Sequence, residues 1–288
     1  MAATAPGIHQ STLVKLRALV PRLSEAERRV ADYILGQPAS IPEMSITQLA
    51  EACGASEATV VRLARRIGLR GYQELRIRLS ADLATGQPHP SGDVEPTDDL
   101  LSACRKLFAG AVQALEETLR VLDGGTLERV VGQVASARRI DLYGVGASGI
   151  VAMDAALKLL RIGLDAHAFT DPHLQATSAA LLGPEDVAIG VSHSGSTKDT
   201  VDALRIAKAS GARTVAVTAF GPSPITRVAD AVLPVVAREP LLREAATGSR
   251  IAAMAVLDAV FAGVLLRRYA ASVRALARTR EAVLDRKY

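Results

Sequence analysis

The sequence predicts an all-helical domain followed by an α/β domain with a parallel sheet. Three observations lead to this fold class. The chain has 288 residues, about twice the length of an average domain. Apolar residues recur at helical spacing before residue 84, and short apolar runs alternate with helical patterns after residue 100. We therefore expect a helical domain at 1–84, a Gly-, Pro- and acid-rich linker at 85–99 and the α/β domain at 100–288.

The composition narrows the class of protein. Apolar residues make up 49 % and charged residues 22 %, as in an ordinary globular chain. Aromatic residues are only 3 % and Trp is absent, which argues against a protein that stacks bases on aromatic rings. The net charge of +4 is too small to indicate nucleic-acid binding, so the position of the charges must decide.

The sequence indicates a cytoplasmic protein with no membrane partner. Its first residues carry no basic start or apolar run of a secretory signal. The longest apolar stretch, Ile251–Leu266, contains Asp258 and is shorter than the roughly 20 residues of a bilayer span, so we expect a buried helix. Cys53 and Cys104 lack metal-ligand spacing, and no metal or cofactor is predicted.

A helix-turn-helix is predicted between Ser45 and Gly71. Gly54 suits the tight turn between two short helices, because glycine adopts left-handed backbone conformations at little cost. Ser56 is a good N-cap for the second helix. The apolar residues of that helix fall at spacings of three and four and form its expected buried stripe: Val60, Leu63, Ala64 and Ile67.

The other face of the second helix is basic. Thr59, Arg62 and Arg66 lie at spacings of three and four, and Arg65 is adjacent. Six arginines between positions 62 and 78 stand against one acid, Glu74. We predict that this helix contacts double-stranded operator DNA, the alternative being an ordinary solvated face. The predicted DNA-contacting residues are Ser56, Thr59, Arg62, Arg65 and Arg66.

Five short apolar runs of the second domain are predicted strands. Because helical patterns separate them, right-handed crossovers should build a parallel sheet with helices on both faces. A long helix at Leu100–Leu122 should precede the sheet. The predicted strands are Ile140–Val145, Ala166–Thr170, Val187–Ser192, Thr214–Thr218 and Ala231–Val236.

Two loops after these strands carry the candidate ligand chemistry. Gly144, Gly146 and Gly149 match the dinucleotide pattern G-x-G-x-x-G, which is weak by itself, and Asp171 could hold a ribose. The segment 192–197 offers four hydroxyls at the start of a helix, where backbone N–H groups and the helix dipole favour an anion.

A phosphate ester held between the two loops is the favoured ligand. Ser148 of the first loop would join Ser192, Ser194 and Thr197 of the second around the phosphate. Two alternatives stay open: a nucleotide bound at the first loop, and hydroxyls that only cap a helix.

These motifs resemble a known family. The turn at 144–148 and the loop at 192–197 resemble the sugar isomerase (SIS) domain, a phosphosugar-binding, flavodoxin-like fold. The segment 45–71 resembles the N-terminal helix-turn-helix of the ribose phosphate isomerase regulator (RpiR) family. The resemblance covers nearly the whole chain and implies a transcriptional regulator that senses a phosphorylated sugar. The ligand-binding residues it implies are Gly146, Ser148, Ser192, Ser194, Gly195, Thr197 and Glu244.

A phosphosugar isomerase with an accessory helical domain is the second hypothesis. Glu244 resembles the position where some SIS isomerases keep their catalytic base. Aldose-ketose isomerisation also usually needs a histidine near the ring oxygen, whereas His193 should lie near the phosphate. Binding without turnover is therefore favoured, and we assign no catalytic residue.

A homodimer or homotetramer is expected, because a helix-turn-helix protein usually reads two half-sites with two copies. The apolar helix at 250–266 is a candidate interface. Binding of the sugar phosphate should then change the relative placement of the two DNA-reading helices.

Overall fold

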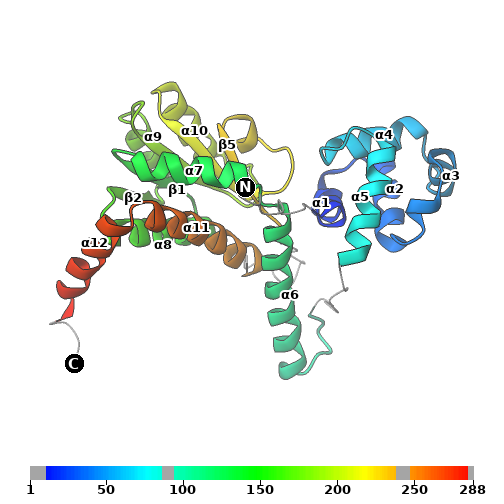
Figure 1. Ribbon diagram of the computed structural model, residues 1–288, viewed down its shortest axis with the longest axis horizontal. Helices are drawn as coiled ribbons and strands as arrows, with labels where there is room; N and C mark the ends of the chain where they lie inside the picture. The colour runs from blue at the N-terminus through cyan, green and yellow to red at the C-terminus, as the bar shows by residue number, and fades with distance from the viewer. Residues whose placement is uncertain (1–10, 86–93, 238–246, 285–288) are drawn as a thin grey trace, which may run out of the picture. The chain divides into compact units, whose positions relative to one another are not determined.

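The computed structural model describes residues 11–85, 94–237 and 247–284, which form two compact units. Unit 1 runs to Val121 and includes the short segment 236–237, and unit 2 holds the rest of the described chain from Leu122. Figure 1 draws the helices and strands of both units. Each unit is described below by itself.

Unit 1 is all-helical, as predicted. Ser24 and Ser45 each begin a helix with a capping box, in which the serine hydroxyl and the third helical residue satisfy one another's free backbone N–H groups. The helices are α1 (Thr12–Leu19), α2 (Glu25–Gly36), α3 (Ile46–Ala52), α4 (Glu57–Arg66), α5 (Tyr72–Thr85) and α6 (Leu100–Val121), with short 3₁₀ turns at Val20–Arg22 and Ile41–Glu43.

The long helix α6 groups with unit 1. It packs against α1, and the guanidinium of Arg17 lies 2.6 Å from the buried carboxylate of Glu117. The predicted boundary at residue 100 places this helix in the second domain instead, because helical periodicity predicts an amphipathic helix but not the element that covers its apolar face. The predicted helix itself, Leu100–Leu122, is confirmed within one residue.

Unit 2 is an α/β unit with a five-stranded, all-parallel sheet, which confirms the predicted fold class. The strand order is β2-β1-β3-β4-β5. All five predicted strands are present, with ends that differ by one or two residues. The strands are β1 (Ile140–Tyr143), β2 (Ala166–Phe169), β3 (Val187–Val191), β4 (Arg213–Ala219) and β5 (Ala231–Val235).

Helices cover both faces of the sheet (Figure 1). On one face α9 (Pro172–Ala179) and α10 (Lys198–Ala209) pack on an apolar cluster that contains Tyr143, Leu204 and Ile225. The other face is covered by α7 (Gly124–Ser136), α8 (Ala147–Arg161) and α11 (Thr247–Arg267), and α12 (Tyr269–Glu281) follows α11. A 3₁₀ turn, Ile225–Arg227, lies between β4 and β5.

Helix α11 is long and apolar enough by composition to cross a membrane. In the structure it packs against α7, α8 and β5, and Ala252, Val256, Val260 and Val264 are buried. It is therefore a core helix of unit 2, as the sequence predicts. This packing also occupies much of the apolar surface that suggested an interface between copies.

The strand order places the candidate ligand loops. The chain enters the sheet at β1, pairs β2 on one side and returns to β3 on the other, so the order reverses between β1 and β3. Open parallel sheets bind ligands at such a point, beyond the carboxyl ends of the strands. The two loops identified in the sequence leave the carboxyl ends of these two neighbouring strands.

Candidate functional site

The helix-turn-helix has the local structure that the sequence predicts. Gly54, in the turn between α3 and α4, has a φ of 58°. The hydroxyl of Ser56 accepts a hydrogen bond from the backbone N–H of Thr59 at 3.2 Å and so caps α4. The predicted stripe on α4 is fully buried: Val60, Leu63, Ala64 and Ile67.

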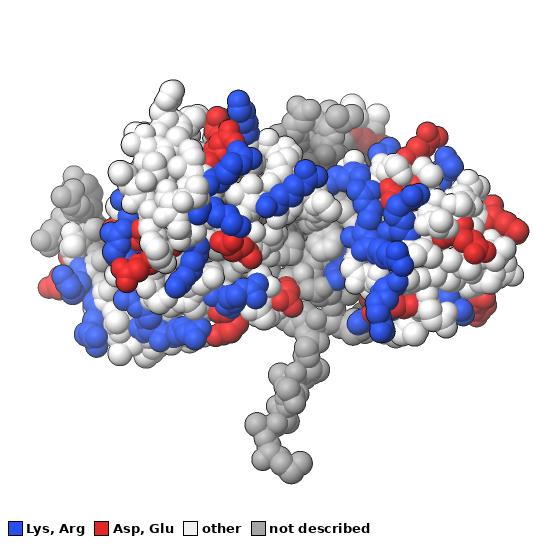
Figure 2. Space-filling view, turned by 90° about the horizontal axis from the view of Figure 1, so that it is seen from above, with Lys and Arg blue, Asp and Glu red and all other residues white. Residues whose placement is uncertain are grey.

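The arginines of α4 are exposed, but two of them are held by a buried acid of α2. The carboxylate of Glu27 lies 2.8 Å from Nη1 of Arg66 and 3.5 Å from Nε of Arg62. Arg65 is exposed and points away from the buried stripe. Figure 2 shows basic side chains gathered on the face of unit 1 that carries α4. An exposed basic helix of this kind can contact the phosphates and base edges of DNA.

Thr59 differs from the other predicted DNA contacts because it is buried. Its hydroxyl lies 2.9 Å from the Ser56 hydroxyl and accepts a hydrogen bond from Nη2 of Arg62 at 3.2 Å. Thr59 therefore orients the start of α4 and the side chain of Arg62. The spacing of three and four residues predicts the face correctly for the arginines, but Thr59 lies at the border between the exposed face and the core.

Glu27 is the residue of unit 1 that sequence reasoning missed. It is a capping-box residue whose carboxylate also accepts hydrogen bonds from the backbone N–H and hydroxyl of Ser24 at 3.1 and 2.8 Å. Burial pushes the pKa of Glu27 upward, but these hydrogen bonds and the charge of Arg66 outweigh burial and hold the pKa below its usual value. The carboxylate is therefore ionised when it contacts the arginines.

In unit 2 a pocket brings the two predicted loops together. Its empty volume is about 320 Å³, which includes space open to bulk solvent. Ser148 lines it from the first turn of α8, directly after the loop that follows β1, and His193 lines it from the loop after β3. The other lining residues come from α8, β3, β4, β5 and α11: Ala147, Val151, Val191, Val217, Thr218, Val235, Ser249, Arg250 and Ala253.

The glycines of the first loop permit a close turn. A Cβ on Gly144 would lie 2.6 Å from the backbone oxygen of Ser148, and one on Gly149 would lie 2.8 Å from the side chain of Thr170. Gly146 has a φ of 59°, a backbone conformation that residues with a side chain rarely adopt. Asp171, the acid that a dinucleotide would need, instead accepts a hydrogen bond from the N–H of Leu174 and caps α9.

The hydroxyls of the second loop border the pocket rather than line it. Ser192 is buried, and its hydroxyl lies 3.0 Å from that of Thr197. Ser194 is exposed and accepts a hydrogen bond from the N–H of Ser196. Gly195 has a φ of 65° and lies directly against Ser223 and Thr218. Glu244 lies outside the described residues.

Three polar lining residues were not predicted from the sequence: Thr218 on β4 and Ser249 and Arg250 on α11. They bring two more hydroxyls and a guanidinium to the pocket. Because Ser249 and Arg250 stand in the first turn of a 21-residue helix, that helix also directs its positive end toward the pocket. The run of hydroxyl and basic residues at 247–250 is the signal that could have identified them.

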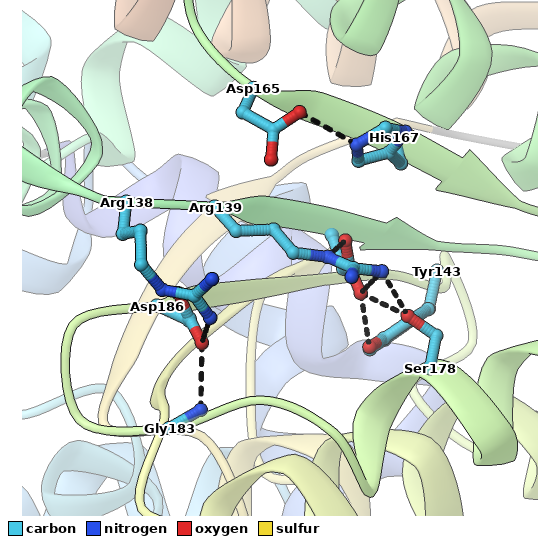
Figure 3. A network of polar contacts seen from close by, with 9 residues as sticks. Arg138, Arg139, Tyr143, Asp165, His167, Ser178, Gly183 and Asp186 are labelled. Atoms are coloured by element: carbon cyan, nitrogen blue, oxygen red, sulfur yellow. Dashed lines mark hydrogen bonds and ion pairs between the residues drawn. The ribbon is translucent and has the colours of Figure 1, made fainter.

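A second polar network lies at the opposite ends of the strands (Figure 3). The carboxylate of Asp141, fully buried on β1, accepts hydrogen bonds from Nε and Nη2 of Arg139 at 2.9 and 3.1 Å and from the Tyr143 hydroxyl at 3.3 Å. The hydroxyl of Ser178 on α9 donates to the same carboxylate. Burial raises the pKa of Tyr143, and the charge of Asp141 raises it further. This network joins β1 to α9.

The described part of the chain contains no cluster of three His, Cys, Asp or Glu side chains that could hold a metal ion. Unit 1 is thus a helix-turn-helix with a basic second helix, and unit 2 is a doubly wound α/β unit with a pocket of mixed polar and apolar lining at its switch point. This pairing defines a class of DNA-binding protein in which a helix-turn-helix unit is joined to an α/β unit.

Comparison with known proteins gives the family. Residues 10–86 match the helix-turn-helix domain of the rpiR family, and residues 133–263 match the SIS domain. An uncharacterised HTH-type transcriptional regulator of Caldanaerobacter subterraneus is 40 % identical over 96 % of this chain and 98 % of its own length. The HTH-type transcriptional regulator HexR of Pseudomonas aeruginosa is 32 % identical over 97 % and 98 %. The chain belongs to the rpiR family of transcriptional regulators.

Among solved structures, the NanR protein of Vibrio vulnificus complexed with ManNAc-6P is similar over 96 % of this chain and 98 % of that one. The sequence identity is 33 % and the TM-score is 0.61. These relatives confirm the predicted family and the prediction of a regulator rather than an isomerase.

Proposed function

We propose that this regulator binds a phosphorylated sugar in unit 2 and changes its affinity for operator DNA in response. The observation that carries the proposal is the pocket at the switch point of the sheet, where Ser148, Ser249 and Arg250 meet. The positive ends of α8 and α11 lie at its wall. Hydroxyl donors, a guanidinium and two helix N-termini together favour a phosphate ester.

The lining of the pocket, together with the capping role of Asp171, favours a sugar phosphate over a dinucleotide. Phosphate would lie between the two loops, near Ser148, Ser192, Ser194 and Thr197, and Gly146 and Gly195 would allow the backbone to approach it. The sugar hydroxyls would meet His193 and Thr218. The similar NanR structure contains ManNAc-6P, which supports the same class of ligand.

Operator DNA would be read by α4, in the cytoplasm. Arg62, Arg65 and Arg66 supply exposed positive charge, and Ser56 lies at the exposed start of the helix. Because Glu27 neutralises part of the charge of Arg62 and Arg66, Arg65 is the arginine most available to a phosphate or a base.

Two copies would present two α4 helices to two half-sites. Helix α8, which begins next to Ser148, carries an exposed apolar row that a second copy would cover: Ile150, Met153, Leu157 and Leu160. Since the same helix borders the ligand pocket, occupancy of the pocket can bias how the copies pair. A coupling free energy of about 1–3 kcal/mol would change DNA affinity roughly 5- to 150-fold.

A thermal-shift panel tests the ligand class. Hexose, pentose and amino-sugar phosphates are compared with their parent sugars, inorganic phosphate and dinucleotides. We expect at least one sugar phosphate to raise the Tm, because a ligand of the native state stabilises it by mass action. Ser148→Ala should weaken the binding of that sugar phosphate about 10- to 100-fold, because a hydrogen bond to a charged group is lost.

Ser136→Ala, an exposed serine on α7 away from the pocket, is the matched control and should bind the ligand normally. A Tm raised by dinucleotides and by no sugar phosphate would reject the ligand class proposed here.

The DNA-binding proposal is tested with Arg65→Ala. A duplex selected by the wild-type chain from random sequences serves as the site, and fluorescence anisotropy measures its Kd at several salt concentrations. Loss of Arg65 should weaken binding about 10-fold and reduce the slope of log Kd against log salt by about 1, because one ion contact is lost.

Arg274→Ala is the control. It removes one positive charge from an exposed arginine of α12 in unit 2 and should leave the Kd for DNA unchanged. If both variants weaken binding equally, the contact is a general charge effect and α4 is not the DNA-reading helix.

A further inference from the structure

Helix α6 carries an apolar row that the rest of unit 1 leaves exposed. Leu101, Phe108, Val112, Leu115 and Leu119 are between 36 % and 72 % exposed, and Phe108 is the most exposed of them. Their spacings of seven, four, three and four residues place them on one side of the 22-residue helix.

The opposite side of α6 is already used within unit 1. Its buried residues are Ala114, Glu117, Thr118 and Val121, and Glu117 is paired with Arg17 of α1. Helix α6 also lies between the two family matches, which end at residue 86 and begin again at residue 133. The exposed row is therefore a feature of the connecting helix and not of either domain that gives the family its name.

Four of the five residues of the row are placed symmetrically about the level of residue 110; the fifth, Leu115, lies at the level of Arg105 in the other half. Leu101 and Leu119 lie nine residues to either side of it, and Phe108 and Val112 lie two residues to either side. When two identical helices pair in antiparallel orientation about this level, each Leu101 meets Leu119 of the partner subunit. Each Phe108 likewise meets Val112 of the partner subunit. The row therefore fits a second copy of itself.

The charges beside the row complement each other in the same arrangement. Arg105 and Glu116 both flank the row on one side, five residues before and six residues after the centre. In an antiparallel pair related by a two-fold axis, residues on the same flank face each other across the interface. Arg105 then lies beside Glu116 of the partner subunit, and the contact occurs twice. Parallel pairing would place Arg105 beside the other flank, which carries Cys104 and Ala111 and no acid.

Neighbouring charges do not oppose this pairing. Lys106 is held by Asp98 at 2.8 Å, and Arg120 lies 3.7 Å from Glu116 on the same helix. Glu116 therefore sits between two positive groups, one of its own chain and one of the partner, in a partly exposed position.

We propose that α6 is a homotypic interface, in which the exposed rows of two copies pack antiparallel and are flanked by two Arg105–Glu116 ion pairs. The inference rests on the proposed function, because it adds to the α8 contact a second contact between the copies that read DNA. Because α6 belongs to the same unit as α4, this contact would join two DNA-reading units directly.

The first test is Phe108→Glu in the full chain, followed by sedimentation equilibrium over a range of concentrations. A charge at the centre of the row should raise the dissociation constant of the α6 contact by at least about 100-fold, so the assembly loses half of its chains. Ile77→Glu is the matched control, because Ile77 is 64 % exposed on α5 of the same unit and lies outside the row. It should leave the assembly unchanged.

Circular dichroism melting shows whether the Phe108 variant folds. An assembly of unchanged mass in the folded Phe108→Glu chain, or a wild-type chain that stays monomeric at every concentration, would overturn the proposal.

The second test uses charge reversal to read the orientation. Arg105→Glu alone and Glu116→Arg alone should each weaken association about 10-fold, because each places like charges together. The double variant Arg105→Glu/Glu116→Arg should recover most of the wild-type affinity. If the double variant associates no more tightly than the single variants, the antiparallel arrangement is excluded. The same result is expected if α6 instead contacts unit 2 or an unrelated protein.

These tests fail separately from those of the proposed function. A folded Phe108→Glu chain should still show the thermal shift with the sugar phosphate. If it does and its assembly is unchanged, only the α6 interface is rejected.

Discussion

A Gly195→Ala chain is expected to bind the sugar phosphate at least about 100-fold more weakly than the wild type, a loss of roughly 2.7 kcal/mol. Gly195 has a φ of 65°, and a Cβ there would lie 2.2 Å from the hydroxyl oxygen of Ser223 and 2.8 Å from that of Thr218. Ser223 is buried, and Ile225, two residues further along the chain, donates its backbone N–H to the carbonyl oxygen of Gly195 at 2.9 Å.

The clash cannot be relieved without moving the loop at 192–197. The loop is tied to β4, since the N–H of Ser192 donates to Val217 and the N–H of Ala219 donates to His193. Displacement of the loop would misplace both His193 and the hydroxyl cluster beside the pocket. Isothermal titration with the sugar phosphate found in the thermal-shift panel measures the loss.

Gly211→Ala is the matched control for the backbone conformation. Gly211 also has a positive φ, 94°, but its Cβ would make only ordinary contacts of 3.4 Å or more with Pro184. It should cost about 1 kcal/mol of unfolding free energy and leave the Kd of the ligand unchanged. Wild-type ligand affinity in Gly195→Ala would show that this loop does not hold the phosphate.

Loss of the Glu27 carboxylate is the second large effect. Glu27→Ala is expected to lower the free energy of unfolding of unit 1 by about 2 kcal/mol, because it removes the buried acceptor of the capping box and of the charged Arg66. Urea unfolding followed by circular dichroism measures the change. Glu25→Gln on the same helix is the control, since its carboxylate is 92 % exposed and should contribute less than about 1 kcal/mol.

The same residue should affect DNA specificity differently from DNA affinity. Glu27→Gln keeps the shape but releases Arg62 and Arg66 and removes one negative charge beside α4. Non-specific binding should stay equal or become tighter, whereas the ratio of specific to non-specific affinity should fall about 10-fold. Competition between the selected duplex and a scrambled duplex measures this ratio. An unchanged ratio would mean that Glu27 only supports the fold.

The pH dependence of stability follows from the lowered pKa of Glu27. A carboxyl whose pKa is lower in the folded state contributes its full stability above its unfolded pKa, about 4.3. That contribution is lost as the pH falls through the folded pKa. As the pH is lowered from 5, the free energy of unfolding should therefore fall more for the wild-type chain than for Glu27→Gln. Urea unfolding midpoints at each pH measure the difference.

Much of the fold could be predicted from the sequence because its signals are local. Buried parallel strands are nearly continuous apolar runs, so Val187–Val191 and its neighbours stand out between helical patterns. The cap at Ser56 and the glycine at 54 depend only on residues within one turn of helix. The ends of the strands are predicted less accurately, because an apolar run continues into the loop beyond the last hydrogen bond between strands.

The parts that the sequence could not predict depend on distant segments that meet in space. Glu27 reaches Arg66 across 39 residues, so no local pattern reveals that pair. Arg250 enters the pocket because α11 begins beside the carboxyl ends of β4 and β5, about 100 residues after Ser148. For the same reason the packing of α6 on α1, rather than on the sheet, was not predictable from its periodicity.

The buried carboxylate of Asp141 has a consequence for how a signal can leave the ligand pocket. Sliding β1 by one residue would remove this carboxylate from Arg139, Tyr143 and Ser178 and turn it to the opposite face of the sheet. Strand β1, which ends at the Gly144 turn, is thus held in register by hydrogen bonds near its amino end. If a ligand binds in the pocket, we therefore expect the helices around the sheet, rather than β1, to carry its signal.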